Sequence, residues 1–136
     1  MHTRFAAILL GFALVVAGCG GGKSTASGPV AAAAREAAAV VQQFQAATAR
    51  GDFAKICDDL LSASERAQAG GSDCPRLMAA RAQGIQQPRI HIRGIELTRT
   101  GALVHVQTTA AGQAPVDDVI KLVRERGRLR IASLGR

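Results

Sequence analysis

The fold is decided by the stretch Arg89-Ile90-His91-Ile92-Arg93-Gly94-Ile95-Glu96-Leu97, in which apolar and polar residues alternate. Alternation with a period of two predicts a β-strand that buries one of its faces. The parity changes at Gly94, and a β-bulge at Arg93-Gly94 would keep the four apolar residues on a common face. This stretch therefore predicts the first, bent strand of a sheet.

Three further strands are predicted downstream. Thr100-Gly101 has the composition of a hairpin turn, and alternation then resumes. The third strand runs from Val116 to Glu125, Arg126-Gly127 forms a turn, and the fourth strand runs from Arg128 to Leu134. These turns put the apolar residues of neighbouring strands on one face, which supports an antiparallel register. That face carries Ile95, Leu97, Val104, Val106, Ile120, Leu122, Leu129 and Ile131.

The chain before Pro88 has helical spacing. Residues 30–50 are rich in alanine and carry an apolar stripe, Gly51 ends this helix, and Asp52 caps the next one. That second helix is short and carries Cys57. The apolar stripe of the first helix contains Ala37, Val40, Val41, Phe44 and Ala47, and that of the second contains Phe53, Ile56, Leu60 and Leu61.

A third helix begins at Asp73-Cys74-Pro75, where proline costs no hydrogen bond. Between the second and third helices, the segment 62–65 fits a capping box that restarts a helical turn. The third helix has Leu77, Met78 and Ile85 on its apolar side and ends at Gly84 or Pro88. Helices followed by a meander predict an α+β fold: three N-terminal helices packed on a curved antiparallel sheet of about four strands.

The first 19 residues have the pattern of a targeting signal. Met1-His2-Thr3-Arg4 is a basic start, and Phe5 to Val16 is an apolar run too short for the ~20 residues of a membrane span. The run ends in Val16-Ala17-Gly18-Cys19, which resembles the lipobox of bacterial lipoproteins. The resemblance implies a signal peptide over residues 1–18 and a lipid on Cys19, which anchors the protein to the extracytoplasmic face of the cell membrane. The alternative is an ordinary secretory signal whose cysteine is incidental.

The lipobox also sets the domain organisation. Residues 19–29 would be the lipidated cysteine and a flexible tether with a reach of about 17 Å, and residues 30–136 one folded domain. With Cys19 acylated, Cys57 and Cys74 remain, and an exported protein is expected to join them in a disulfide. Zinc is not expected, because His91 and His105 lack a close paired spacing with the cysteines.

Composition and charge exclude some classes of binding partner. The 136 residues have 17 Lys+Arg against 10 Asp+Glu, a net charge of +7, without a basic run. Nucleic acid is not an expected partner, because the chain is predicted to be exported and lacks interleaved aromatic residues. No cofactor is expected either: Gly20-Gly21-Gly22-Lys23-Ser24 lies in the tether and lacks the spacing of a phosphate-binding loop.

The order of helices and strands resembles the nuclear transport factor 2-like superfamily, in its small secreted actinobacterial form. The resemblance covers most of residues 30–134. It rests on Val40-Val41 and Phe44 before Gly51-Asp52-Phe53, on Cys57-Asp58-Asp59-Leu60-Leu61-Ser62 with Cys74, and on the stretch from Val119 to Ile131. These motifs specify structure and not activity. Leu129 stands where the final strand of that family often carries Trp, which implies a smaller or better-filled cone.

Three polar groups are candidates for chemistry. His91, Glu96 and His105 lie on the first two strands, and Glu96 with His105 forms either an acid–base pair or a solvated cross-strand pair, the latter favoured. The doublet Asp58-Asp59 is expected to solvate its helix. Asp118 shares parity with Ile120 and would face the mouth of the cone.

Relatives that resemble ketosteroid isomerase use an aspartate base together with a tyrosine donor, and this chain has no Tyr. The third group is Lys121, Arg128 and Arg130 on one sheet face, which would either meet anionic lipid or cell-wall polymer or simply be solvated, the latter favoured.

The sequence thus predicts a lipid-anchored envelope protein whose domain binds an envelope protein or a small apolar ligand and is not an enzyme. The alternative is an isomerase- or dehydratase-like enzyme with Asp118 as the general base. A third hypothesis is a structural spacer or assembly partner that dimerises weakly through the sheet face carrying Val123.

Overall fold

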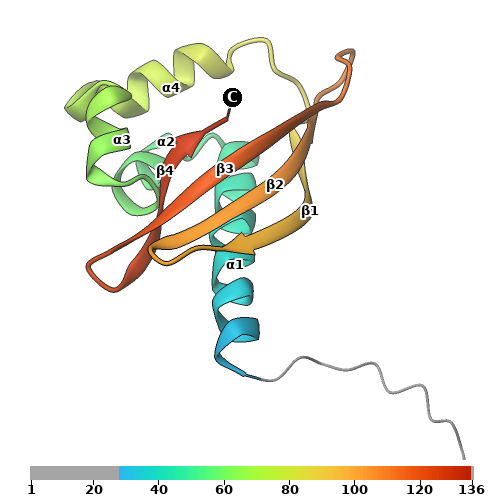
Figure 1. Cartoon of the computed structure of the whole chain (residues 1–136). Coiled ribbons are helices and arrows are strands. Elements are labelled where there is room, and N and C mark those ends of the chain that lie inside the picture. The colour runs from blue at the N-terminus through green and yellow to red at the C-terminus, as the bar shows by residue number, and fades with distance from the viewer. Residues whose placement is uncertain (1–27, 136) are drawn as a thin grey trace, which may run out of the picture.

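The computed structural model describes residues 28–135, which form an α+β fold with a four-stranded antiparallel sheet (Figure 1). The predicted signal peptide, Cys19 and all of the tether before Gly28 lie outside the described residues. In chain order the helical elements are α1 (Pro29–Arg50), α2 (Phe53–Lys55), a π-helical turn (Ile56–Leu60), α3 (Ala63–Gln68), a 3₁₀ turn (Gly71–Asp73) and α4 (Cys74–Ala82). The strands are β1 (Arg89–Leu97), β2 (Gly101–Thr109), β3 (Val116–Glu125) and β4 (Arg128–Leu134).

The sheet has the order β1-β2-β3-β4, so each strand pairs with its neighbour in the chain. Its register shifts between Ile92 and Gly94, where the sequence predicts the bulge. Arg126 and Gly127 both have positive φ, at 50° and 80°. This is the backbone of a tight hairpin turn between twisted strands. The predicted strands and turns are therefore confirmed, and a second register shift lies between Lys121 and Leu122.

Helix α1 packs against one face of the sheet, and the main core lies between them (Figure 1). Helix α1 contacts β1, β2 and β4. The buried apolar residues of the central strands β2 and β3 are 3% exposed or less. Leu129 of β4, in the place where the resembled family often has Trp, is 6% exposed. The fully buried side chains include Val41, Ile56, Val104, Val106, Leu122 and Ile131.

The chain between α1 and α4 is held by local caps. Gly51 has a left-handed φ of 68° and ends α1, and the Asp52 carboxylate accepts a hydrogen bond from the Lys55 amide at 3.1 Å. The Ser62 hydroxyl accepts one from the Glu65 amide. The Ser62 amide, however, donates to the Ile131 carbonyl at 2.8 Å. This bond ties the segment before α3 to β4 and takes the amide that a reciprocal capping box would use.

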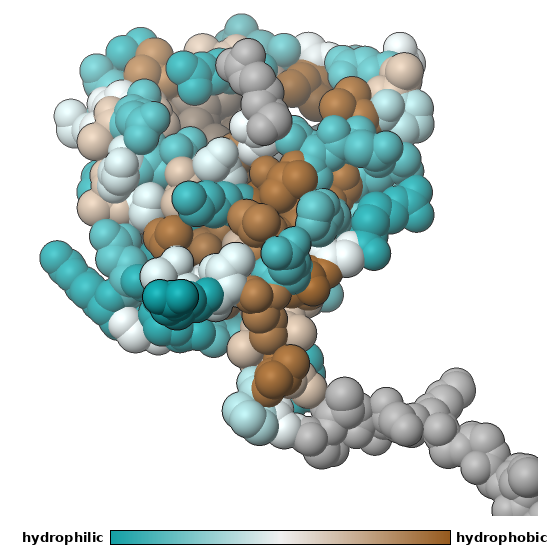
Figure 2. All heavy atoms as spheres, viewed as in Figure 1, coloured by the Kyte–Doolittle hydropathy of each residue, from teal (hydrophilic) through white to brown (hydrophobic). Residues whose placement is uncertain are grey.

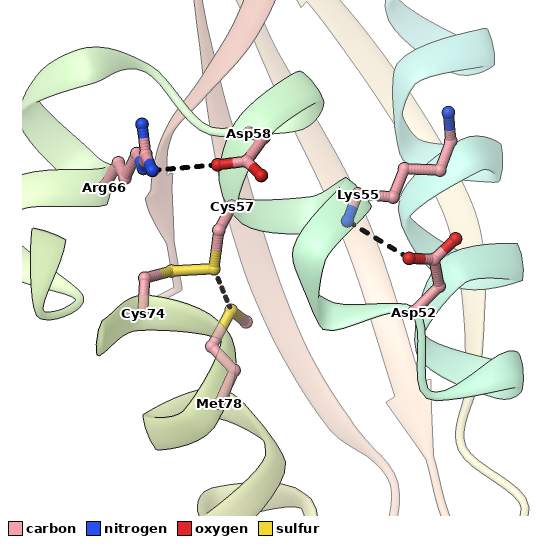
Figure 3. Close-up of polar contacts among 7 residues, drawn as sticks. All are labelled: Asp52, Lys55, Cys57, Asp58, Arg66, Cys74 and Met78. Atoms are coloured by element: carbon pink, nitrogen blue, oxygen red, sulfur yellow. Dashed lines mark hydrogen bonds and ion pairs between the residues drawn. A yellow bond between two sulfur atoms is a disulfide. The ribbon is translucent and has the colours of Figure 1, made fainter. Parts of the chain in front are cut away.

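Cys57 and Cys74 form the predicted disulfide, which joins the π-helical turn to the start of α4 (Figure 3). Both cysteines are fully buried, and the Met78 sulfur lies 3.7 Å from the Cys57 sulfur. The disulfide and its thioether neighbour therefore fasten the first half of α4 to the rest of the domain.

Two helical details differ from the prediction. Of the two predicted ends of the third helix, Gly84 is close to the observed one: α4 ends at Ala82, Gln83 leaves the helical path with a ψ of 131°, and Gly84 follows with a φ of 82°. Ile85, predicted on the apolar side of this helix, therefore lies beyond it and is 45% exposed. The helical turn expected after Ser62 is a separate helix, α3, and the second helix continues as a π-helical turn that holds Cys57.

Candidate functional site

A groove of about 720 Å³ lies between the second half of α1, α2, α4 and the segment that leads into β1. Small side chains leave this space open: Ala79 and Ala82 stand three positions apart on one face of α4, opposite Ala49 of α1. Phe53, Ile85 and Pro88 supply larger apolar surface. The polar residues that line the groove are Gln45, Thr48, Gln83, Gln87 and Arg89.

Gln45 gives the groove a polar atom with a defined role. Its Nε2 donates a hydrogen bond to the Pro88 carbonyl at 2.9 Å. Because a carbonyl only accepts, this bond fixes which end of the amide is nitrogen. The Oε1 atom is then a buried acceptor without a hydrogen-bond partner among the described residues. An unsatisfied buried acceptor costs about 1–3 kcal/mol, so an N–H or O–H donor that reached this buried atom would be favoured.

The segment 83–88 forms the outer wall of the groove. Gln87 has a φ of 50°, which is rare for a residue with a side chain. The Gln86 carbonyl accepts a hydrogen bond from the Ala111 amide at 2.9 Å, and this bond ties the wall to the loop between β2 and β3. Ile85 exposes 45% of its surface beside the opening. The wall is therefore held at its ends and presents an apolar side chain between them.

The groove offers binding surface and little acid–base chemistry. No carboxylate, imidazole or thiol is among its lining residues in the described chain, and its ionisable residue is Arg89. A general base must be a group that takes a proton near neutral pH, and a guanidinium does not. The lining suits a neutral, largely apolar group that carries a hydrogen-bond donor.

Asp118 lies on the predicted face of β3, paired with the buried Val106. Its carboxylate accepts a hydrogen bond from the Val119 amide at 2.9 Å and lies against Gly135 at the end of β4. Asp118 and His105 both line a hollow of about 580 Å³, which is open at the surface of the sheet. The two side chains come from opposite faces of the sheet, because His105 pairs with Val119 and not with Asp118.

Glu96 and His105 are brought together as predicted, with Oε2 and Nε2 4.0 Å apart. Their side chains are 66% and 50% exposed, on the face of the sheet away from α1. Gln107 extends the polar row on this face, because it accepts from Arg93 and donates to Asp117 at 3.1 Å. This geometry fits the solvated cross-strand pair that the sequence favours.

The other predicted polar groups are spread out. Asp58 pairs with Arg66 at 2.9 Å, as Figure 3 shows, and Asp59 lies 3.6 Å from Lys55. Arg128 and Arg130 line a hollow of about 380 Å³ together with acidic residues of α1 and the π-helical turn. Lys121 is not among the residues that line this hollow, so the three predicted cations do not form one patch there.

A salt bridge joins α1 to the end of β3. The Arg124 guanidinium donates to both carboxylate oxygens of Glu36, at 3.1 and 2.7 Å. These hydrogen bonds hold the pKa of Glu36 below its ordinary value. The same guanidinium donates to the Gly127 carbonyl at 2.9 Å, so Arg124 connects α1 with the β3–β4 turn.

Neither a metal cluster nor a membrane span stands out in residues 28–135. In this part of the chain no three His, Cys, Asp or Glu side chains are grouped as metal ligands would be. None of its helices is long and apolar enough to cross a bilayer. A scan against models of protein families and searches of curated proteins and of solved structures found no match to this chain.

Sequence reasoning missed the groove. It is lined by residues from 45 to 89 that meet only when α4 packs on α2 near the end of α1. A signal was nevertheless present, because Ala79 and Ala82 place small residues on one face of α4.

Proposed function

We propose that this chain is a lipid-anchored envelope protein whose domain binds, without catalysis, a neutral apolar group in the groove between α1 and α4. Cys19 carries the anchor at the extracytoplasmic face of the cell membrane. The occupant is a small apolar ligand or an apolar side chain of an envelope protein. The helices and the curved sheet together form the cone of a nuclear transport factor 2-like domain.

The observation that carries the proposal is the lining of the groove. Alanines on α1 and α4 leave about 720 Å³ open, and Gln45 holds an unpaired acceptor beside it. Binding sites combine apolar surface with a few placed polar groups in this way. The absence of a carboxylate, imidazole or thiol from the lining supports binding in preference to acid–base catalysis.

The enzymatic alternative uses Asp118. Support for it comes from the hollow that Asp118 and His105 both line. Against it, His105 is half exposed and its ion-pair partner is Glu96. Acid–base chemistry of the isomerase type also needs a donor to the developing oxyanion, and the chain has no Tyr to supply one.

Dye binding tests the groove. The probe is N-phenylnaphthylamine, a neutral fluorescent dye with one N–H donor. The double variant Ala79→Leu/Ala82→Leu adds three carbons at each of two positions in the lining of the groove. These carbons occupy the space that the dye would take, so binding should weaken at least tenfold. The matched control is Ala80→Leu, which is exposed on the same helix outside the groove and should bind as the wild type does. Equal affinities for all three proteins would reject the groove as the binding site.

Mass spectrometry tests the anchor. Membrane-extracted protein should begin at Cys19 and carry a diacylglyceryl group, and Cys19→Ala should give an uncleaved or soluble form. A Cys19→Ala variant that still carries the lipid, or wild type that lacks it, would contradict the anchor without bearing on the groove.

Light scattering tests assembly. The sheet face that carries Val123 has no helix packed on it among the described residues (Figure 1), and we propose a weak homodimer through this face. A concentration-dependent rise in mass that Val123→Glu abolishes supports this dimer, and a constant monomer mass contradicts it.

A further inference from the structure

One end of the domain combines the start of α1 with the two tight turns of the sheet (Figure 1). Arg124 connects all three: its amide donates to the Thr100 carbonyl of the β1–β2 turn at 2.8 Å, and its guanidinium contacts Glu36 and Gly127. The start of α1 projects beyond both turns (Figure 1). We call the start of α1 and these two turns the tethered end, because Cys19 precedes Pro29 by only ten residues.

The tethered end has an apolar tip. Helix α1 begins with Pro29, Val30 and four alanines, and its first charged residue is Arg35. Val30 exposes 70% of its surface, more than any other large apolar side chain of the described residues. Figure 2 shows hydrophobic residues over this projecting part of the molecule. No other described element covers the tip (Figure 1), so it is available to an apolar surface.

The two turns beside this tip are basic, and we call their arginines the rim (Figure 1). Arg99 lies in the β1–β2 turn, Arg126 in the β3–β4 turn and Arg128 directly after it, and all three are exposed. Arg124 is already paired with Glu36. An apolar tip that projects beyond a cationic rim matches the layers of an anionic bilayer, where acyl chains lie beneath phosphate headgroups.

We infer that the tethered end seats on the anionic membrane surface, with the tip of α1 in the interface and Arg99, Arg126 and Arg128 on lipid phosphates. This inference rests on the proposed anchor at Cys19. A lipid on Cys19, ten residues before Pro29, would keep the tip near the bilayer. The lipid anchor thus holds the domain near the membrane, and the tip and rim determine which end of the domain faces it.

Seating has a consequence for the groove. Gln45 lies fifteen residues after Val30 on the same helix, which places the groove about 22 Å further along the α1 axis. The groove therefore lies well above the bilayer surface in this orientation, so its occupant comes from the extracytoplasmic space and not from the lipid on which the domain stands.

Single tryptophans can report the orientation, because the chain contains no Trp and no Tyr. The mature lipidated protein is reconstituted into vesicles of phosphatidylcholine and phosphatidylglycerol in equal parts, with brominated acyl chains as quenchers. Val30→Trp should emit at shorter wavelength and be quenched, whereas Ala82→Trp in the groove should not be quenched. Vesicles of phosphatidylcholine alone should reduce the quenching of Val30→Trp.

Charge variants test the rim. Arg99→Gln/Arg126→Gln/Arg128→Gln in the Val30→Trp background should lower the ratio of seated to unseated protein on the order of a hundredfold, since each arginine near an anionic surface contributes roughly a fivefold bias. The matched control is Arg50→Gln/Arg76→Gln/Arg81→Gln, which removes the same charge from exposed positions on α1's last residue and α4 and should leave quenching unchanged.

The outcomes separate the two proposals. Protein that is absent from the vesicles contradicts the anchor at Cys19. Protein that is present, but in which Val30→Trp and Ala82→Trp are quenched equally or the two charge variants behave alike, overturns the seated orientation and leaves the anchor standing.

Discussion

Removing the Cys57–Cys74 disulfide should destabilise the domain and open the groove. The bridge joins α4 to the π-helical turn, and both of its residues are fully buried. Helix α4 supplies one wall of the groove, and its described contacts are with short elements: α2, the π-helical turn and the 3₁₀ turn. Loss of the bridge therefore removes the covalent link between that wall and the π-helical turn.

The size of the effect follows from the closed loop. The two cysteines are separated by 17 positions in the chain, and closing a loop of that length stabilises a fold by about 3 kcal/mol on the chain-entropy account. A domain of roughly 100 residues changes its Tm by about 4–5 °C per kcal/mol near the midpoint. The double variant Cys57→Ala/Cys74→Ala should therefore melt roughly 12–15 °C below the wild type.

Thermal unfolding followed by circular dichroism measures this shift. Wild-type protein in a strong reductant is the control, because it keeps both sulfur atoms and loses only the bond. It should melt close to the double variant, and both should bind N-phenylnaphthylamine more weakly than the oxidised wild type. A double variant that melts within about 3 °C of the wild type would refute the reasoning that the bridge holds α4 in place.

Two further perturbations test the sheet and the link from α1 to the sheet. Gly101→Ala should cost about 1–3 kcal/mol, measured by urea unfolding, because a Cβ there would collide with the Leu122 backbone; Gly94→Ala, where a Cβ would meet nothing within 4 Å, is the matched control and should be nearly neutral. Glu36→Gln should lower the Tm slightly at neutral pH, because the Arg124 hydrogen bonds lower the pKa of Glu36 in the folded state. That stabilisation is present above the ordinary pKa of 4.5 and is lost as the pH falls through the depressed folded value, so the melting curves of the two proteins should converge in acid. A difference that persists at the lowest pH would contradict this origin.

The strands were predictable because their information is local. Alternation from Ile90 to Leu97 has only one parity change, and the structure has its bulge there. Parity also put Asp118 on the face of Ile120, and in the structure Asp118 pairs with the buried Val106. It did not foresee that the carboxylate lies against Gly135 at the end of β4, because that contact depends on where two strands end.

The groove and the end of α4 depend on tertiary packing, and local patterns do not specify it. Helical spacing from Leu77 continues to Ile85, which is why Ile85 was expected on the apolar side. The chain leaves the helix at Gln83, the left-handed Gly84 follows, and Ile85 is exposed at the rim of the groove. A local break in the backbone thus makes a predicted core residue part of the lining of the groove.

The most direct test of the central claim is the location of a bound apolar group by nuclear Overhauser effects. Protein labelled at alanine, isoleucine and valine methyl groups is titrated with N-phenylnaphthylamine. Contacts from the dye to the methyls of Ala79, Ala82 and Ile85, with none to Val119 on the open sheet face, are the predicted result. Contacts to Val119 with none to Ala79 or Ala82 would contradict the groove as the binding site.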